Sequence, residues 1–178
     1  MQRVVEDLIS LSRIEAEKFS TPTEAVAVGP LIDQALEGAM RMAGERGSAL
    51  RRELASGLPP IVADRGEILQ LLDNLLTNAL RYGEPGTPVT VAACAEGPMV
   101  RLSIADRGEG IAPEHVARVT ERFYRVDTSR SRSLGGTGLG LSIVKHIVER
   151  HRGRLKIDST LGKGTTVHVL LPVAAAVS

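Results

Sequence analysis

The spacing of apolar residues along the chain predicts several long helices. Residues 1–19 lack glycine and proline and carry a wide apolar stripe at helical spacing, which must be buried on the domain or on another helix. The same spacing recurs over residues 30–47, 64–82 and 139–151, and a shorter helix is expected over residues 113–123. The stripe of the first segment consists of Val4, Val5, Leu8, Ile9 and Leu11.

The ends of these segments carry residues that start and stop helices. Pro30 fits the first position of the second helix, and Gly47 is suited to end it. Asp64 and Glu67 have the spacing of an N-terminal capping box, with the aspartate as the cap. Gly153 is expected to close the last long helix.

Alternation of apolar and polar residues predicts strands between and after the helices. It is found over residues 49–54, 88–95 and 99–106, and residues 154–160 and 164–172 are expected to form a β-hairpin. Sequential antiparallel strands with helices on one face are typical of an α+β fold, here a two-layer sandwich. We therefore expect a mixed, mostly antiparallel sheet that is covered by helices on one face and preceded by an N-terminal helix.

Composition and charge exclude several classes of function. The chain is 43% hydrophobic and 24% charged with a net charge of +1, so it lacks the basic balance of a nucleic-acid-binding protein or a membrane-surface protein. The single cysteine, Cys94, lies in a strand-like run and is expected to be a small packed residue. No run reaches the roughly 20 apolar residues of a membrane helix and no signal peptide is evident, so we expect a soluble chain.

Two asparagines stand one turn apart in the helix expected over residues 64–82. Asn78 lies at the border of the apolar face beside Leu71, whereas Asn74 lies on the polar face. A half-buried carboxamide needs hydrogen-bonding partners, and its oxygen suits Mg²⁺, which prefers oxygen ligands and often shares phosphate oxygens. Taken alone, the pattern is more typical of two solvated polar residues on an amphipathic helix.

Two glycine clusters interrupt the second half of the chain. Asp106 ends a buried strand and is followed by Gly108 and Gly110, so its carboxylate could accept a hydrogen bond from the amino group of adenine. Taken alone, this segment fits an ordinary turn better. In residues 135–142, GGTGLGLS, alternate glycines precede a helix, where backbone N–H groups can approach an anion. The spacing is neither that of a Rossmann fingerprint nor that of a P-loop.

The segment between the two clusters is polar and basic, as expected of a mobile loop. Arg125, Arg130 and Arg132 could reach phosphates from it. A solvated loop without that role is the alternative interpretation.

Taken in order, these segments resemble the ATP-binding domain of sensor histidine kinases, which belong to the GHKL (Bergerat-fold) superfamily. DNLLTNALRY resembles the N box, DRGEGI the G1 box, ERFYRVD the F box and GGTGLGLSIVKHIVERHRG the G2 box. STLGKGTTVHVLLP resembles the closing hairpin, and the likeness covers residues 30–172. Each motif is moderately specific, whereas four in the same order are very specific.

The resemblance implies a role for each matching residue. Asn78 would coordinate Mg²⁺ on the triphosphate of ATP, with Asn74 beside it, and Asp106 would accept from the adenine amino group. Arg81 would approach the phosphates, Phe123 would anchor the lid over the nucleotide, and either Thr165 or Thr166 would assist Asp106 through a water. The other residues expected at the nucleotide are Tyr82, Gly108, Gly110, Ile111, Gly136, Thr137, Gly138, Leu139 and Gly140.

The N-terminal segment resembles the end of the second helix of a dimerisation and phosphoacceptor domain. Its amino-acid sequence is most similar to the phosphate-regulon type of sensor kinase. The expected organisation is therefore a dimerisation helix over residues 1–19, a linker over 20–29, the ATP-binding domain over 30–173 and a tail over 174–178. The resemblance implies a homodimeric parent protein that is anchored in the bacterial inner membrane, with this part in the cytoplasm and a response regulator as its partner.

The phosphoacceptor motif of the family matches none of the four histidines, which are His115, His146, His151 and His168. The chain is therefore expected to begin inside the dimerisation domain and to be unable to phosphorylate itself in cis.

The expected function is transfer of the γ-phosphate of MgATP to a histidine on the dimerisation domain. ATPases of the superfamily carry a water-activating carboxylate one turn before the metal-binding asparagine, and Asn74, which occupies that position here, cannot take a proton at neutral pH. Asp73 is adjacent but points about 100° away around the helix. The alternatives are an anti-sigma-type serine kinase and a non-catalytic ATP-binding scaffold.

Overall fold

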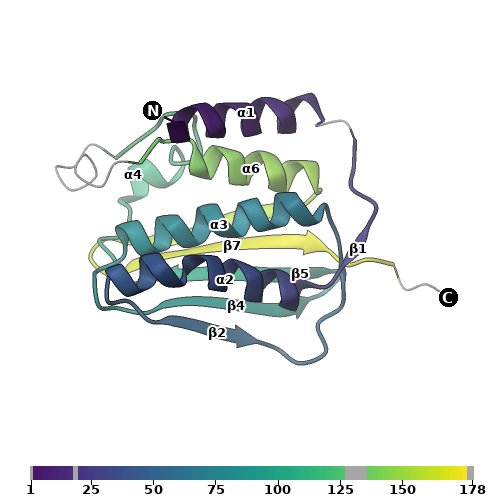
Figure 1. Cartoon of the computed structure of the whole chain (residues 1–178), viewed down its shortest axis with the longest axis horizontal. Helices are drawn as coiled ribbons and strands as arrows, with labels where there is room; N and C mark the ends of the chain where they lie inside the picture. The colour runs from purple at the N-terminus through teal and green to yellow at the C-terminus, as the bar shows by residue number, and fades with distance from the viewer. Residues whose placement is uncertain (1, 18–19, 127–135, 176–178) are drawn as a thin grey trace.

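The computed structural model describes residues 2–17, 20–126 and 136–175 (Figure 1). Arg130 and Arg132, for which contact with phosphates and a solvated loop are the two interpretations, lie outside these residues. The elements are α1 (Gln2–Ala16), β1 (Ala25–Val26), α2 (Val28–Glu45), β2 (Leu50–Leu54), β3 (Ile61–Val62), α3 (Arg65–Tyr82), β4 (Val89–Glu96), β5 (Met99–Asp106), α4 (Pro113–Val116), α6 (Gly140–Arg150), β6 (Arg154–Thr160) and β7 (Gly164–Pro172).

The main sheet has the strand order β2-β4-β5-β7-β6. β2 runs parallel to β4, because α3 lies between them in the chain, and the other neighbouring strands are antiparallel. A separate antiparallel pair joins β1 to β3. The expected mixed, mostly antiparallel sheet is confirmed, and so is the hairpin of β6 and β7.

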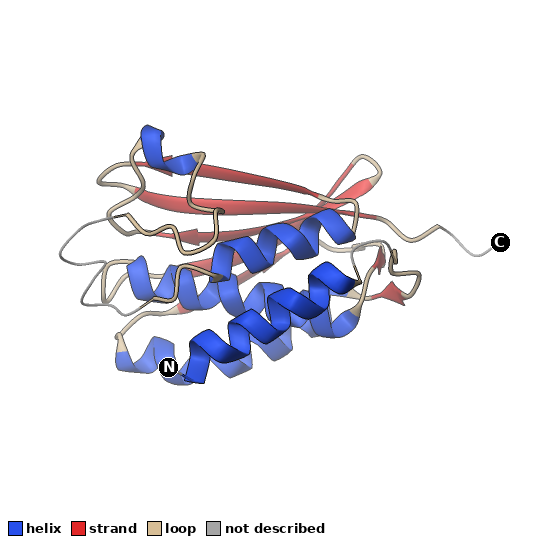
Figure 2. Ribbon diagram, turned by 90° about the horizontal axis from the view of Figure 1, so that it is seen from above, coloured by secondary structure: helices blue, strands red, loops and turns tan. Residues whose placement is uncertain are grey.

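Helices α2, α3 and α6 cover one face of the sheet, and α1 lies against α6 as an outer helix (Figures 1 and 2). Alternate residues of the central strands, such as Val91, Leu102 and Val169, are fully buried beneath these helices. Their neighbours in sequence point to the uncovered face, where Ser103 and Arg101 are partly exposed. The period-two pattern of the strands therefore identifies the core face. None of the described helices is long and apolar enough to cross a bilayer.

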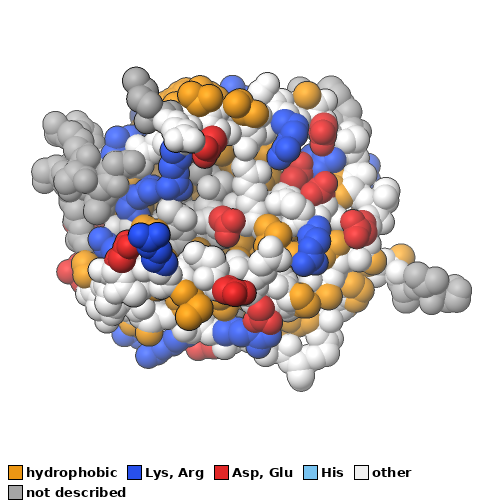
Figure 3. All heavy atoms as spheres, in the orientation of Figure 1, with side chains coloured by type: hydrophobic (Ala, Val, Ile, Leu, Met, Phe, Trp, Pro, Cys, Tyr) orange, Lys and Arg blue, Asp and Glu red, His pale blue; other side chains and the backbone are white. Residues whose placement is uncertain are grey.

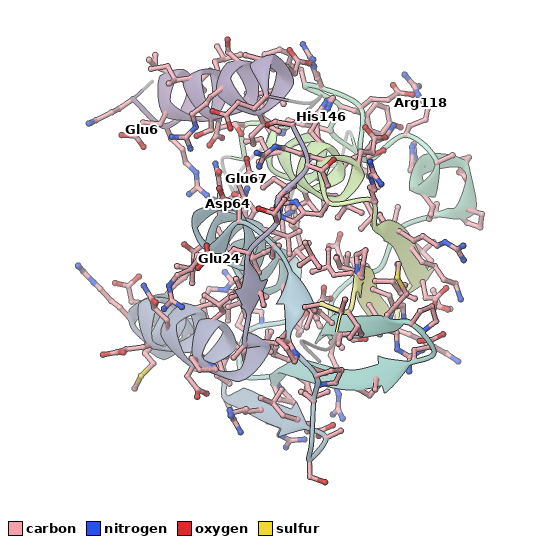
Figure 4. The ribbon with its side chains drawn as sticks, turned by 90° about the vertical axis from the view of Figure 1, so that its right-hand side faces the viewer. Glu6, Glu24, Asp64, Glu67, Arg118 and His146 are labelled. Atoms are coloured by element: carbon pink, nitrogen blue, oxygen red, sulfur yellow. The ribbon has the colours of Figure 1, made fainter. Side chains whose placement is uncertain are left out.

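The start of α3 is fixed by the predicted cap. The Oδ1 atom of Asp64 accepts a hydrogen bond from the backbone N–H of Glu67 at 3.0 Å, which confirms the expected capping interaction. Asp64 and Glu67 lie side by side at this end of the helix (Figure 4). The cap sets the register of α3 and hence the direction in which its asparagines point.

A buried polar cluster joins the end of α6 to the start of α3. Arg150 Nη1 lies 2.5 Å from Glu67 Oε2, and both side chains are almost completely buried. His151 Nδ1–H donates to the Ile147 carbonyl at 2.7 Å, while the N–H of Asp64 donates to His151 Nε2 at 3.0 Å. The imidazole is therefore the neutral Nδ1–H tautomer, because Nε2 must accept. Burial is the main reason that the pKa of His151 is lowered from its usual value of 6.5.

This lowered pKa predicts that the fold loses stability in mild acid. The folded state resists protonation of His151 while the unfolded state accepts it, so the free energy of unfolding should fall as the pH drops below about 6.5. Above that pH the contribution of His151 is fully present. Urea unfolding of the chain at pH 8 and at pH 5.5 measures the change, and His151→Gln, whose amide does not titrate, should show a smaller one. An equal change in both proteins would contradict the assignment.

Two element boundaries differ from the sequence prediction. The helix expected over residues 113–123 ends at Val116, and residues 117–122 form turns. This happens because Phe123 adopts a φ of 61° and its N–H donates to the Gly138 carbonyl at 2.9 Å, which a continuing helix would not allow. The linker expected over residues 20–29 contains β1 and the first residues of α2, so Pro30 lies within the first helical turn rather than opening it.

The apolar stripe of α1 is divided between two surfaces. Leu11 and Ile14 are 2% and 1% exposed and pack into the core. Val5, Leu8 and Ile9 remain 55%, 43% and 65% exposed, and hydrophobic side chains are visible along the edge of the molecule formed by α1 (Figure 3). We call these three residues the outer face of α1.

Candidate functional site

A single pocket collects most of the residues singled out in the sequence. Its volume is about 330 Å³, and it opens between α3, the ends of β5 and β7, and the start of α6. The residues predicted at the nucleotide that line it are Asn74, Asn78, Arg81, Tyr82, Asp106, Gly110, Ile111, Gly136, Thr137, Gly138, Gly140 and Thr165. Segments from four parts of the chain therefore meet at one cavity.

Asp106 occupies one end of this pocket, at the last position of β5. Its Oδ1 atom accepts a hydrogen bond from the N–H of Gly108 at 3.0 Å, and β5 pairs here with β7 so that Asp106 faces Thr165. Burial raises the pKa of Asp106 from 3.8 to about 6, although its hydrogen bonds to backbone N–H groups oppose the rise. A partly buried carboxylate suits a ligand that donates a hydrogen bond.

Hydroxyl groups surround this end of the pocket. Ser159 Oγ accepts from the N–H of Ile111 at 2.7 Å and lies 2.7 Å from Thr165 Oγ1. Of the two threonines considered from the sequence, Thr165 lines the pocket, whereas Thr166 pairs with Ala105 and is not part of the lining. Sequence analysis missed Ser159, although its place in the first strand of the predicted hairpin, close to the turn, was the available signal.

The two asparagines of α3 line the pocket from below. Asn78 faces Gly140 at the start of α6, because a Cβ atom on that glycine would lie 3.8 Å from both polar atoms of the carboxamide. Asn74 Nδ2 is buried without a hydrogen-bond partner among the described residues. An unsatisfied buried donor is costly, so Asn74 is suited to an acceptor that a ligand supplies.

Several arginines meet at the pocket. Arg81 and Arg125 line it, and burial, followed by the nearby charge of Arg3, lowers the pKa of Arg81 from its usual value. Guanidinium groups that converge in a pocket are suited to a multiply charged anion, because the anion offsets their mutual repulsion. The pocket thus combines an acceptor, Asp106, with cations.

The glycines allow backbone segments to approach one another closely. A side chain at Gly108 would collide with the carbonyl of Tyr82, and one at Gly110, whose φ is 74°, would collide with the carbonyl of Thr160. Gly138, with a φ of 77°, leaves only 2.8 Å between its missing Cβ and the Cα of Phe123. These positions require glycine even without a ligand, since they bring the pocket walls together.

Three residues expected at the nucleotide do not line the pocket. Gly108 and Leu139 lie behind its wall, where Leu139 is fully buried in the core. The side chain of Phe123 is 57% exposed, and this residue contacts the lid segment through its backbone hydrogen bond to Gly138. They act on the pocket by supporting the residues that line it.

The sequence did not single out His115 and Tyr124, which also line the pocket. His115 Nδ1 is hydrogen-bonded to the hydroxyl of Tyr124, and the guanidinium of Arg118 lies 4.4 Å from the centre of the tyrosine ring. His115 lies in the shortened helix α4, and Arg118 and Tyr124 lie in the turns after it, so their meeting depends on turns that no periodic pattern reveals.

Residues 63–175 match the family described as histidine kinase-, DNA gyrase B- and HSP90-like ATPases. The chain belongs to this ATPase family. Its matched region begins just before α3 and runs to the end of the described chain, so it includes every pocket-lining segment except Arg3. The fold is the Bergerat fold that the sequence predicted.

Several relatives of this chain are sensor kinases. The chain is 37% identical over 166 residues to the phosphate regulon sensor protein PhoR of Pseudomonas aeruginosa, covering 93% of this chain and 37% of that protein. It is 36% identical over 174 residues to the sensor histidine kinase WalK of Bacillus subtilis, covering 97% of this chain and 28% of that protein. The chain therefore spans about a third of the length of these relatives.

Solved structures of sensor kinases share the whole arrangement. Full-length ShkA in complex with AMPPNP superposes with a TM-score of 0.85 and 32% identity, covering 99% of this chain and 36% of that one. The mycobacterial sensor histidine kinase MprB gives a TM-score of 0.72 and 32% identity over 86% of this chain and all of that one. Within its family, this chain is an ATP-binding domain of the sensor histidine kinase type.

Proposed function

We propose that the chain is the catalytic domain of a sensor histidine kinase, which transfers the γ-phosphate of ATP to a histidine on a dimerisation domain for relay to a response regulator. The observation that carries the proposal is that Asp106, Asn78 and Arg81 line the same pocket. This arrangement fits adenine at the aspartate and phosphates at the arginines.

The residues present also fit Mg²⁺ as the accompanying ion. No group of three or more His, Cys, Asp or Glu side chains among the described residues could hold a metal by itself. Mg²⁺ is commonly bound through one or two protein oxygens together with substrate phosphates, and Asn78 offers such an oxygen in the pocket. Asn78, with Asn74 beside it, would hold the ion, which would neutralise charge on the phosphates.

The protein residues act mainly by positioning and by charge. Arg81, Arg125 and the backbone of the lid glycines would hold the phosphates, while Asp106 fixes the base. Asn74 stands where an ATPase of the superfamily needs a carboxylate, and an amide cannot remove a proton from water. This favours transfer to a nucleophile that is ready to attack, such as a neutral imidazole, over hydrolysis.

The four histidines of the chain are each engaged in other contacts. His115 bonds to Tyr124, His151 is buried, and His168 lies 2.7 Å from Ser103 Oγ and 3.1 Å from Asp158 Oδ2. His146 lies 3.8 Å from Glu15 Oε1. We therefore place the acceptor on a dimerisation domain, to which α1 would belong, with residues 20–29 as the linker, residues 30–173 as the catalytic domain and residues 174–178 as a tail.

Phosphotransfer to an added acceptor tests the proposal. The chain is incubated with ATP carrying a labelled γ-phosphate and with a separately produced dimerisation domain that contains an intact acceptor helix. Label is expected on the added domain and not on the chain itself. The same domain with its acceptor histidine replaced by alanine is the control.

Label on the chain would contradict the expected acceptor. Label on serine, stable in acid, would favour the serine-kinase alternative, because phosphohistidine is acid-labile. Binding of ATP without any transfer would favour the scaffold.

A further inference from the structure

The pocket includes one residue from outside the matched domain. Arg3, in the first turn of α1, lines it together with Arg81 and Arg125. The rest of the lining comes from residues 74–167. The outer helix therefore contributes a cation to a site that the domain otherwise builds alone.

Contacts along its whole length hold α1 in place. Near its start, Asp7 Oδ2 accepts a hydrogen bond from the hydroxyl of Thr137 at 2.8 Å. Near its end, Glu15 forms an ion pair with Arg122, and Arg150 Nε donates to the carbonyl of Glu17 at 3.3 Å. With Leu11 and Ile14 buried between these contacts, the rotation of α1 about its own axis is fixed.

The position of Arg3 follows from this rotation. Arg3 lies one helical turn before Asp7, and side chains four residues apart share one face of a helix. Because Asp7 touches Thr137 in the glycine-rich segment, Arg3 faces the pocket beside that segment.

Arg3 meets like charges at the pocket, although Glu109 also lines it. Arg3 forms no ion pair with any carboxylate in the described ranges, and it lies close enough to Arg81 to lower the pKa of that residue. Arg125 acts on Arg81 in the same direction. Like charges that converge repel one another, and a bound polyanion offsets this cost.

We infer that Arg3 binds the phosphate tail of the nucleotide, so that the ligand is held jointly by α1 and by the catalytic domain. This inference rests on the proposed function, since it requires ATP in the pocket. The phosphates rather than the base are the partner, because Arg3 lines the pocket together with Arg81 and Arg125, and guanidinium groups bind phosphate oxygens. By linkage, a nucleotide that binds Arg3 strengthens the docking of α1 to the same extent that docked α1 strengthens nucleotide binding.

The test compares two ligands that share a base and differ in phosphates. Calorimetry measures the binding of ATP and of adenosine to the 178-residue chain and to Arg3→Ala. Arg3→Ala is expected to bind ATP about tenfold more weakly, and adenosine as the unchanged chain does. Arg13→Ala, an exposed arginine of α1 that does not line the pocket, is the matched control and should change neither affinity.

Further variants separate charge from structure. Arg3→Lys should recover part of the loss, whereas Arg3→Glu should exceed it, since it places a negative charge beside the phosphates. Equal losses for ATP and adenosine, or an unchanged ATP affinity in Arg3→Ala, would overturn the inference. If the unchanged chain binds neither ligand, the proposed function itself fails, and the two failures are thereby distinguished.

Discussion

Replacing Asp106 with asparagine is expected to weaken ATP binding about 100-fold. The Oδ1 atom of Asp106 accepts from the N–H of Gly108, so the asparagine must keep its oxygen there. Its NH₂ group then replaces the second carboxylate oxygen, so a donor would meet the amino group of adenine, another donor. Calorimetry with MgATP measures the loss, and Asp158→Asn, on β6 outside the pocket, is the control.

The same substitution should alter the choice of base. Inosine triphosphate carries a carbonyl oxygen where adenine has its amino group, and this oxygen can accept from the new amide. The ratio of ATP affinity to ITP affinity should therefore fall in Asp106→Asn. An unchanged ratio would show that Asp106 does not contact this edge of the base.

Asp106→Asn should also stabilise the ligand-free protein. The pKa of Asp106 is raised from 3.8 to about 6, so the folded state holds its proton more tightly than the unfolded state does. Stability is then lost as the pH rises from about 4 to 6, and the cost is complete above pH 6. An asparagine does not ionise and so avoids the cost of a buried charge. The free energy of unfolding at pH 7.5 should therefore rise by about 1 to 2 kcal/mol, after allowance for partial exposure. Urea unfolding at pH 7.5 and pH 4 checks this, because the gain should shrink in acid.

Replacing Asn78 with alanine is expected to remove most of the effect of Mg²⁺ on nucleotide binding. If its carboxamide oxygen is a ligand of the ion, ATP affinity in the presence of Mg²⁺ should fall about 30-fold, which corresponds to about 2 kcal/mol. In EDTA the variant and the unchanged chain should bind ATP alike. Thr77→Ala, the preceding position on α3 and not part of the pocket, is the matched control.

The two conditions make this prediction specific. A loss of the same size with and without Mg²⁺ would mean that Asn78 supports the pocket rather than the ion. Asn74→Ala provides a comparison within the same helix, because its Nδ2 is a buried donor and should contribute to ATP affinity in either condition.

The sequence predicted those parts of the fold that rest on local periodicity or on chemistry between near neighbours. The capping interaction of Asp64 with Glu67 was evident from a spacing of three residues, and the strands on each side of Gly97 from their alternation. The pairing of β1 with β3 was not predicted, since two-residue strands have no period. The length of α4 was wrong because the contact between Phe123 and Gly138 is tertiary, and such contacts override local propensity.

The residues of the site that lie in sequence motifs could be predicted. Asp106, Asn78 and the alternate glycines were expected in one place, and the structure brings them to one pocket. Arg3 could not be found in this way, because it is joined to the pocket through a contact between Asp7 and Thr137 that spans 130 positions. The apolar stripe of α1 predicted a buried helix, but only these polar contacts decide that Leu11 faces inward and Ile9 outward.

The two edges of the main sheet have a consequence for how copies of the chain can meet. β2 exposes Arg51, Arg52 and Glu53, and β6 exposes Lys156 and Asp158. Charged side chains on an edge strand oppose the addition of a further strand from another molecule. Association through a continuous sheet is thereby discouraged at both ends, whereas the outer face of α1 offers exposed apolar side chains to a second helix.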